Sequence, residues 1–190
     1  MACEHRRHRG AKYSMIIEDI VSREIVDEYR LLRSYDPMTS IQRGDRKKHL
    51  LKPVKTPLAD FDVRYEQVNN YHDYYLYRKQ TGRCVGLFTI EDTGDRMKVL
   101  QPGIRAVTPH MALAPEAQRQ GISTQAYTTF LRGGPWVFVT DEHTQGAARL
   151  WDSIASGDIV SFYVDQQGRS VPKPGPGDTR VLGPRSRFRL

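Results

Sequence analysis

The sequence predicts an α/β or α+β domain with a mixed sheet, and the order of its hydrophobic patterns supports that prediction. A helical repeat near the N-terminus is followed by strand-like stretches, and then by helices that alternate with short apolar strands. The chain has 190 residues, of which 38% are hydrophobic and 27% charged, close to the values of globular proteins. One domain with additional terminal sequence fits this length.

The first predicted helix follows Ser14, which is a candidate N-cap. Its apolar side recurs at steps of three and four residues, through Ile17, Val21, Ile25, Tyr29 and Leu32. Asp36-Pro37 is expected to end this helix, because a residue before proline avoids the helical region. Residues 37–60 contain three prolines and a basic cluster, and we interpret them as a long loop.

Strand patterns begin at Phe61. We expect strands over 71–79 and 84–91 joined by the Thr81-Gly82 turn, and a further strand over 104–113.

The second half of the chain predicts two helices and a closing hairpin. One helix carries Ile122, Ala126, Tyr127 and Phe130 on one side, and Gly133-Gly134-Pro135 ends it. The remaining expected elements are a buried strand over 136–140, a helix over 144–155, and a hairpin formed by 159–164 and 169–171. From Pro172 onward the chain is rich in proline, glycine and arginine, and we interpret 172–190 as an extended arm.

The formal net charge of +7 is unevenly distributed. Residues 1–13 carry +3, and residues 41–55 and 166–190 each carry +5, which leaves the rest of the chain at −6. Basic segments around a mildly acidic body suit contact with a polyanion, either an acidic protein or a nucleic acid. Solvated ends that aid solubility are the alternative interpretation.

Several classes of protein are not expected from this sequence. No apolar run reaches the roughly 18 residues of a membrane span, and the basic N-terminus lacks the apolar region of a secretory signal. Cys3 and Cys84 do not form a disulfide framework, so a cytoplasmic location is expected. Cys3, His5 and His8 lack the spacing of a zinc site, and no metal is expected. The chain has no Walker A loop, nucleophile elbow or paired-carboxylate motif.

The most informative stretch is 113–123, where a predicted strand leads into a predicted helix. Such a junction presents unpaired backbone N–H groups at the positive end of the helix dipole. Gly121 lets the chain approach a phosphate closely, and Ser123 is nearly as small. Arg119 can add a charge-assisted contact. We therefore predict an anion-binding cradle.

The same stretch resembles the signature of the GNAT superfamily of acyl-CoA-dependent N-acyltransferases. That signature is an apolar residue, any residue, proline, two residues, Gln or Arg, two residues, glycine, any residue, and Gly or Ala. Gln118 and Gly121 fit it, while Ser123 replaces the last small residue. The order of predicted elements over 15–171 is also similar to that of the family. The resemblance implies a mixed, mostly antiparallel central sheet flanked by helices, with extended basic arms at 1–14 and 172–190.

The resemblance also implies acetyl-CoA, or another acyl-CoA, as co-substrate. Its pantetheine arm would pair like a strand with backbone near Leu113 and Ala114, and its pyrophosphate would lie on the 118–123 loop. The expected cofactor-binding residues are Leu113, Ala114, Gln118, Arg119, Gln120, Gly121, Ile122, Ser123 and Thr144.

Transfer of an acyl group to an amine needs a base for the ammonium and an acid for the departing thiolate. His110 is the first candidate base, because it lies on the strand before the cradle and histidine titrates near neutrality. Glu91 is the second candidate, and a purely structural histidine is the alternative. The family position of the tyrosine acid is occupied by Trp151, whose indole cannot act as an acid, so we expect Trp151 to be a packing residue. Tyr127 and Tyr163 are other possible acids that fit core positions equally well.

Two functions follow from these observations. The first is an N-acetyltransferase acting on an unidentified amine, with the basic segment around Arg43 and Lys47 hinting at an acidic or nucleic-acid-associated acceptor. The second is a catalytically reduced binding or structural protein, favoured by Trp151, Ser123 and the basic ends. Short chains of this kind resemble acetyltransferase-like proteins encoded by tailed bacteriophages, which would place the protein in a host cytoplasm or a virion.

Overall fold

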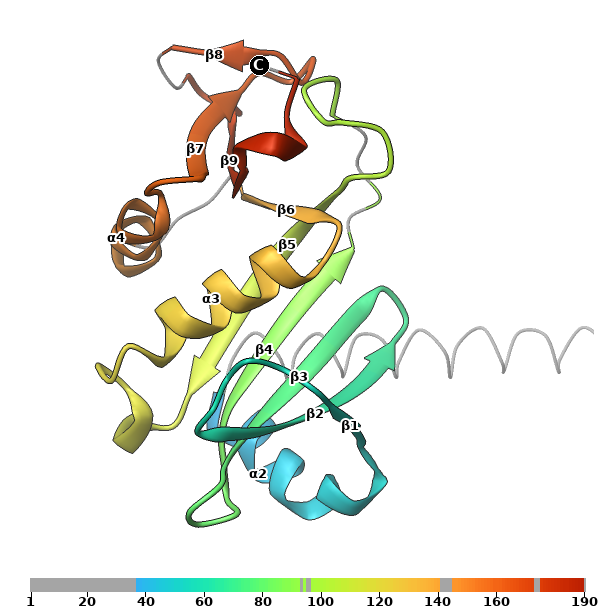
Figure 1. Ribbon diagram of the computed structural model, residues 1–190, viewed down its shortest axis with the longest axis vertical. Helices are drawn as coiled ribbons and strands as arrows, with labels where there is room; N and C mark the ends of the chain where they lie inside the picture. Colours follow the sequence, from blue (N-terminus) through green and yellow to red (C-terminus); the bar gives the residue numbers. More distant parts are fainter. Residues whose placement is uncertain (1–36, 93, 95–96, 141–144, 173–174, 190) are drawn as a thin grey trace, which may run out of the picture.

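The computed structural model describes residues 37–92, 94, 97–140, 145–172 and 175–189. The basic N-terminal arm 1–14 and the helix expected at 17–32 lie outside these residues. The described strands form one sheet in the order β1-β2-β3-β4-β5-β6-β9-β7-β8 (Figure 1). Their bounds are β1 Lys52–Val54, β2 Phe61–Val68, β3 Tyr71–Arg78, β4 Cys84–Asp92, β5 Arg105–Leu113, β6 Trp136–Thr140, β7 Ile159–Val164, β8 Ser170–Val171 and β9 Thr179–Pro184.

All neighbouring strands pair antiparallel except β5 and β6, which are parallel. The predicted mixed, mostly antiparallel α+β architecture is therefore confirmed. The strands expected at 71–79, 84–91, 104–113 and 136–140 are β3 to β6, and the expected closing hairpin is β7 and β8. Only two residue pairs join β7 to β8, whereas six join β7 to β9. The larger partner of β7 was thus missed.

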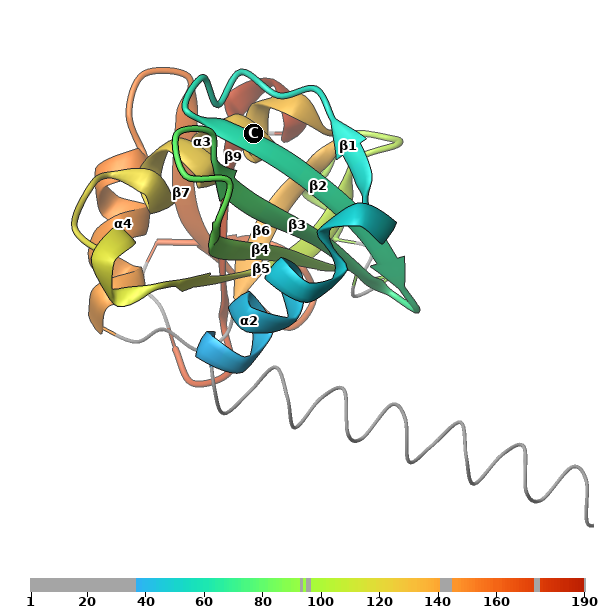
Figure 2. The ribbon, with the colours of Figure 1, turned by 90° about the horizontal axis from the view of Figure 1, so that it is seen from below.

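Helices cover opposite faces of this sheet. On β3, the neighbouring residues Tyr74 and Tyr75 point to opposite sides, as strand geometry requires. Phe130 of α3 (Ile122–Gly133) packs on Tyr74, with ring centroids 4.4 Å apart. Gly44 of α2 (Pro37–Lys47) lies against Tyr75, so α2 covers the other face, as the view from below shows (Figure 2).

The face under α3 holds the main aromatic core. Phe130 stacks on Phe88 with centroids 4.7 Å apart, and Tyr127 meets Phe88 and Phe138 edge to face. Trp151 and Ile154 of α4 (Gln145–Ile154) are buried in the same cluster. The apolar side predicted for α3 is therefore confirmed. None of the described helices is long and apolar enough to cross a membrane.

The long loop expected at 37–60 was wrong, because its prolines occupy positions where regular structure tolerates them. Pro37 is the first residue of α2, where no intrahelical N–H bond is needed. Pro53 lies in β1, an edge strand with one partner. The basic residues Arg46 and Lys47 fall in the last turn of α2, where cations complement the helix dipole.

The extended C-terminal arm at 172–190 was also wrong. Residues Thr179–Pro184 form β9, which lies between β6 and β7 in the interior of the sheet. Val181 and Leu182 are completely buried. Phe188 is 4% exposed and packs edge to face on Phe162. A short apolar run is enough for a strand that is covered on both sides.

The C-terminal residues also form hydrogen bonds with the end of α3. The Arg187 guanidinium donates to the carbonyl oxygens of Leu131, Arg132 and Trp136. These carbonyls belong to the end of α3 and the strand after it, where a cation offsets the negative end of the helix dipole. The Gln101 amide donates to the Phe188 carbonyl at 3.0 Å. The described core therefore extends to Phe188.

Candidate functional site

The centre of the sheet contains an open strand edge. β4 and β5 are in register from Val107 to Leu113 of β5, but β5 and β6 are in register only from Arg105 to Val107. Beyond Val107, β5 stays paired with β4, whereas β6 leaves β5 and pairs with β9 (Figure 1). Among the described residues, no strand pairs with this edge of β5 beyond Val107. Backbone polar groups in the middle of a sheet normally have partners, so this open edge is a candidate ligand-binding site.

Pro109 explains why the parallel ladder ends there. Arg105 N–H donates to Pro135 on the β6 side, and Ala114 N–H donates to Val85 on the β4 side. Because backbone groups alternate along a strand, the odd-numbered residues of β5 face β6. Pro109 is one of these and has no N–H to offer. A proline in a central strand thus occupies a position where the strand is in effect an edge.

Two residues remain whose N–H and C=O both face the open edge. They are Met111 and Leu113, by the same alternation. Ala114 was expected to pair with pantetheine, but its N–H already donates to the Val85 carbonyl at 3.0 Å. The Gln118 amide donates to the Leu113 carbonyl at 3.3 Å, so Gln118 lies at the end of the open edge.

The open edge of β5 leads into the predicted cradle. A 3-10 turn at Pro115–Ala117 leads into residues Arg119 and Gly121, whose φ angles are +59° and +74°. α3 begins at Ile122 without a side-chain N-cap, so its first N–H groups are not covered by a capping side chain. A Cβ at Gly121 would meet no atom within 4 Å. The geometry is that of an open anion-binding turn.

The side chains of the cradle differ in what they do. The Gln120 side chain is held at both ends, because it donates to Glu116 O at 2.6 Å and accepts from Arg78 Nη2 at 2.8 Å. Arg119 is exposed, Ser123 is partly exposed, and Ile122 is 4% exposed in the core. Sequence reasoning missed Arg78, because this residue comes from β3, 42 positions before Gln120.

On the face of the sheet under α2, the structure brings the two candidate bases together. His110 Nε2 lies 3.6 Å from Glu91 Oε2. The His110 side chain is 57% exposed and that of Glu91 26%. Asn70, in the turn between β2 and β3, donates to the other carboxylate oxygen of Glu91 at 3.4 Å. Sequence reasoning treated His110 and Glu91 as alternatives and did not single out Asn70.

A buried polar pair lies beside His110 on the same face. Asp73 is fully buried and accepts a 2.6 Å hydrogen bond from the Thr89 hydroxyl. Thr89 is the cross-strand partner of His110. A buried carboxylate is stabilised only when it is hydrogen-bonded, so the bond to Thr89 stabilises Asp73. The two side chains form a polar pair next to the strand position of His110.

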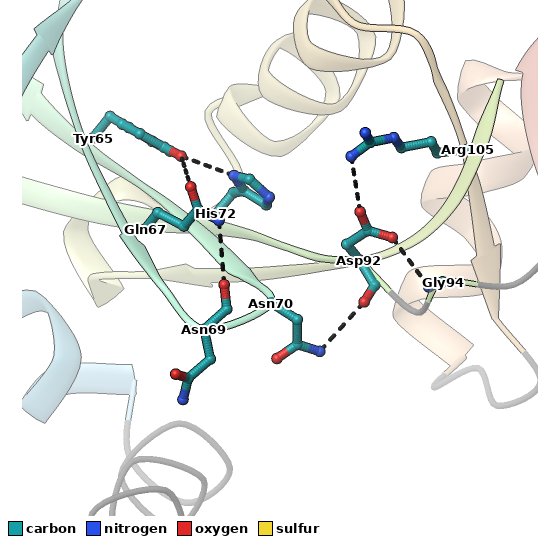
Figure 3. A network of polar contacts seen from close by, with 8 residues as sticks. All are labelled: Tyr65, Gln67, Asn69, Asn70, His72, Asp92, Gly94 and Arg105. Carbon is teal, nitrogen blue, oxygen red and sulfur yellow. Dashed lines mark hydrogen bonds and ion pairs between the residues drawn. The ribbon is translucent and has the colours of Figure 1, made fainter. Parts of the chain in front are cut away.

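The opposite face carries a polar network at the end of the sheet (Figure 3). The Tyr65 hydroxyl lies 2.9 Å from His72 Nδ1, and burial lowers the pKa of His72. Burial therefore favours the neutral imidazole over the imidazolium. Asp92 pairs with Arg105 at 3.0 Å, and Asn70 donates to the Asp92 backbone carbonyl. Asn70 thus connects this network to Glu91 and helps to fix the position of the carboxylate.

The candidate acids lie apart from this region. Trp151 is 2% exposed, which confirms it as a packing residue. Tyr127 is 6% exposed, and burial raises the pKa of its hydroxyl, so it is unsuited to proton transfer. Tyr163 of β7 is partly exposed, with its ring 5.9 Å from Arg180 Cζ. Thr144 lies outside the described residues.

Other chemistries find little support in the described part of the chain. Burial raises the pKa of the Cys84 thiol to about 12, so this cysteine is no nucleophile at neutral pH. Within the same residues, no three His, Cys, Asp or Glu side chains form a group that could hold a metal ion.

Comparisons with known proteins show only a weak structural similarity. No protein-family model and no curated protein matches the chain. Among solved structures, the chain is similar to a crystal structure provisionally described as a phosphinothricin N-acetyltransferase. The two share 12% sequence identity with a TM-score of 0.36, over 61% of this chain and 72% of the other. A similarity of this size leaves the function to be inferred from the chain's own residues.

Proposed function

We propose that the protein is an acyl-CoA-dependent N-acyltransferase that transfers an acyl group, acetyl in the simplest case, to an amine. The observation that carries this proposal is the open edge of β5, which leads directly into an uncapped helix N-terminus at Gly121. An extended arm with amide groups and a phosphate at its end matches both parts at once.

The residues present fit such a donor. The backbone groups of Met111 and Leu113 would pair with the amides of the pantetheine arm, so Met111 replaces Ala114 in the pair of residues that the sequence indicated. Gln118 would have to release the Leu113 carbonyl for that pairing. The N–H groups at the start of α3 would hold the pyrophosphate, with Gly121 leaving space for it.

His110 is the proposed base. It would accept a proton from the amine as the nitrogen attacks the thioester carbonyl carbon, with the C–N bond forming and the C–S bond breaking. Glu91 would favour the resulting imidazolium, and Asn70 would hold the Glu91 carboxylate in place. The departing thiolate would take its proton from water.

A catalytically reduced binding protein remains the second candidate, because Trp151 is buried where the family carries its acid. The C-terminal arm no longer supports this alternative, since β9 is part of the sheet. The enzyme must bind an acyl-CoA donor, whereas the binding protein need not, so donor binding distinguishes the two candidates.

Calorimetry with acetyl-CoA and the purified full-length protein tests the proposal. We expect saturable binding with a stoichiometry of one. A protein that binds neither acetyl-CoA nor CoA contradicts the enzyme assignment and favours the binding protein.

Once an amine acceptor has been found by screening, His110→Ala tests the base. We expect turnover to fall by about 10²-fold or more, with loss of the pH limb near neutrality and unchanged donor binding. His49→Ala, at an exposed position in the turn after α2, is the matched control. A His110→Ala enzyme that keeps its rate and pH profile would move the role to water or to Glu91.

A further inference from the structure

Arg78 is the basic residue that the structure adds to the cradle. It is the last residue of β3, and its position is fixed by a backbone bond from its N–H to the Arg83 carbonyl at 3.0 Å. Its guanidinium reaches across to the helix junction and donates to Gln120 Oε1 at 2.8 Å. Gln120 belongs to the cradle and directly precedes Gly121, so the guanidinium contacts the cradle through this side chain.

The charge of Arg78 is not neutralised by this contact. Gln120 is an amide and accepts a hydrogen bond without adding negative charge. Across the described part of the chain, no carboxylate lies within ion-pair distance of Arg78. A guanidinium has five N–H donors in a fixed fork, and the bond to Gln120 uses one of them.

The two hydrogen bonds of the Gln120 side chain fix the position of its contact with Arg78. The Gln120 side chain is also bonded to Glu116 O at 2.6 Å, so Arg78 is tied to a loop that is itself internally braced. A cation placed in advance beside a helix N-terminus suits a phosphate better than either feature does separately.

We infer that Arg78 is a phosphate-binding residue for the acyl donor, and that its guanidinium makes a charge-assisted contact with a phosphate group of CoA. The inference rests on the proposed function, because the donor site is the open β5 edge together with the cradle. Two phosphates of CoA could supply the contact, the pyrophosphate and the 3′-phosphate. The chemistry that Arg78 recognises is the same in both.

The experiment is calorimetric titration of the full-length protein and its Arg78→Gln variant with CoA, 3′-dephospho-CoA and pantetheine. Arg83→Gln is the matched control, since it removes the same charge from an exposed position in the adjoining turn. We expect Arg78→Gln to weaken CoA binding by about tenfold or more, Arg83→Gln to change it by less than about twofold, and pantetheine binding to be unaffected by either. Equal losses for CoA and 3′-dephospho-CoA assign the contact to the pyrophosphate, and a loss for CoA alone assigns it to the 3′-phosphate.

Gln120→Ala separates charge from positioning. It removes the tether but keeps the guanidinium, so we expect a smaller loss of CoA affinity than in Arg78→Gln. Arg78→Gln binding CoA as tightly as wild type, or no more weakly than Gln120→Ala, overturns the inference while leaving the proposed function intact. A wild-type protein that binds neither nucleotide overturns both.

Discussion

The cradle and the C-terminal segment each depend on one glycine, but these two glycines have opposite surroundings. They are Gly121, directly before α3, and Gly183, inside β9. A Cβ at Gly121 would meet nothing within 4 Å, whereas one at Gly183 would lie 2.7 Å from Val137 Cγ1 and 3.0 Å from Phe188 Cζ. One glycine leaves a space open and the other allows a space to be filled. The comparison shows that the atoms around a glycine, rather than the glycine itself, distinguish an open turn from a core strand.

The largest expected effect comes from removing the core segment altogether. Deletion of residues 179–190 eliminates β9 and separates β6 from β7, and it also removes the Arg187 contacts to the end of α3. We expect the truncated protein to lose its cooperative thermal transition, measured by circular dichroism. Arg189→Ala, at an exposed position in the same segment, should unfold like wild type. A truncated protein with a native-like transition would show that the sheet tolerates the loss of an interior strand.

A smaller effect is expected from Gly183→Ala. The added methyl group must displace Val137 or Phe188, and overpacking of this kind typically destabilises a core by about 1–3 kcal/mol. Chemical denaturation measures the change in the free energy of unfolding. Gly133→Ala is the control, because a Cβ there meets nothing within 4 Å, and it should unfold close to wild type. Equal stability of the two variants would contradict the packing described for β9.

The smallest effect on stability is expected from Gly121→Ala, but this substitution should affect ligand binding specifically. A non-glycine residue in the left-handed region costs about 1–2 kcal/mol. Gly103→Ala should cost the same, since Gly103 also has a positive φ and open space around it. Only Gly121→Ala should weaken acetyl-CoA binding, by about tenfold or more, because its methyl group enters the phosphate space. Parallel denaturation and calorimetry check both expectations, and equal binding by the two variants would remove Gly121 from the donor site.

Local sequence patterns were sufficient for much of the fold. β3, β4 and α3 show clear alternation or helical spacing, so their existence followed from the residues themselves. β9 was missed because its apolar run is short and lies among prolines, glycines and arginines, while its two partners are distant in sequence. α2 was missed because Pro37 was interpreted as the end of the preceding helix rather than as the first residue of a new one.

The candidate site also contains residues that the sequence could nominate and residues that it could not. Residue type and spacing were enough to nominate His110 and the 118–123 loop. Arg78 and Asn70 depend on strand register and on which turn meets which loop, and a single sequence does not specify either. The use of Ala114 N–H by β4 likewise follows from register alone.

Pro109 has a consequence for the rate of binding as well as for its geometry. Because this residue has no N–H, a closed sheet in which β6 followed β5 further would lack one of its ladder bonds. The open edge is therefore preorganised: no paired strands need to separate before a ligand binds, and only the Gln118 side chain must leave the Leu113 carbonyl. Association should then be a single kinetic phase whose rate rises linearly with ligand concentration, limited by diffusion and orientation rather than by the separation of strands.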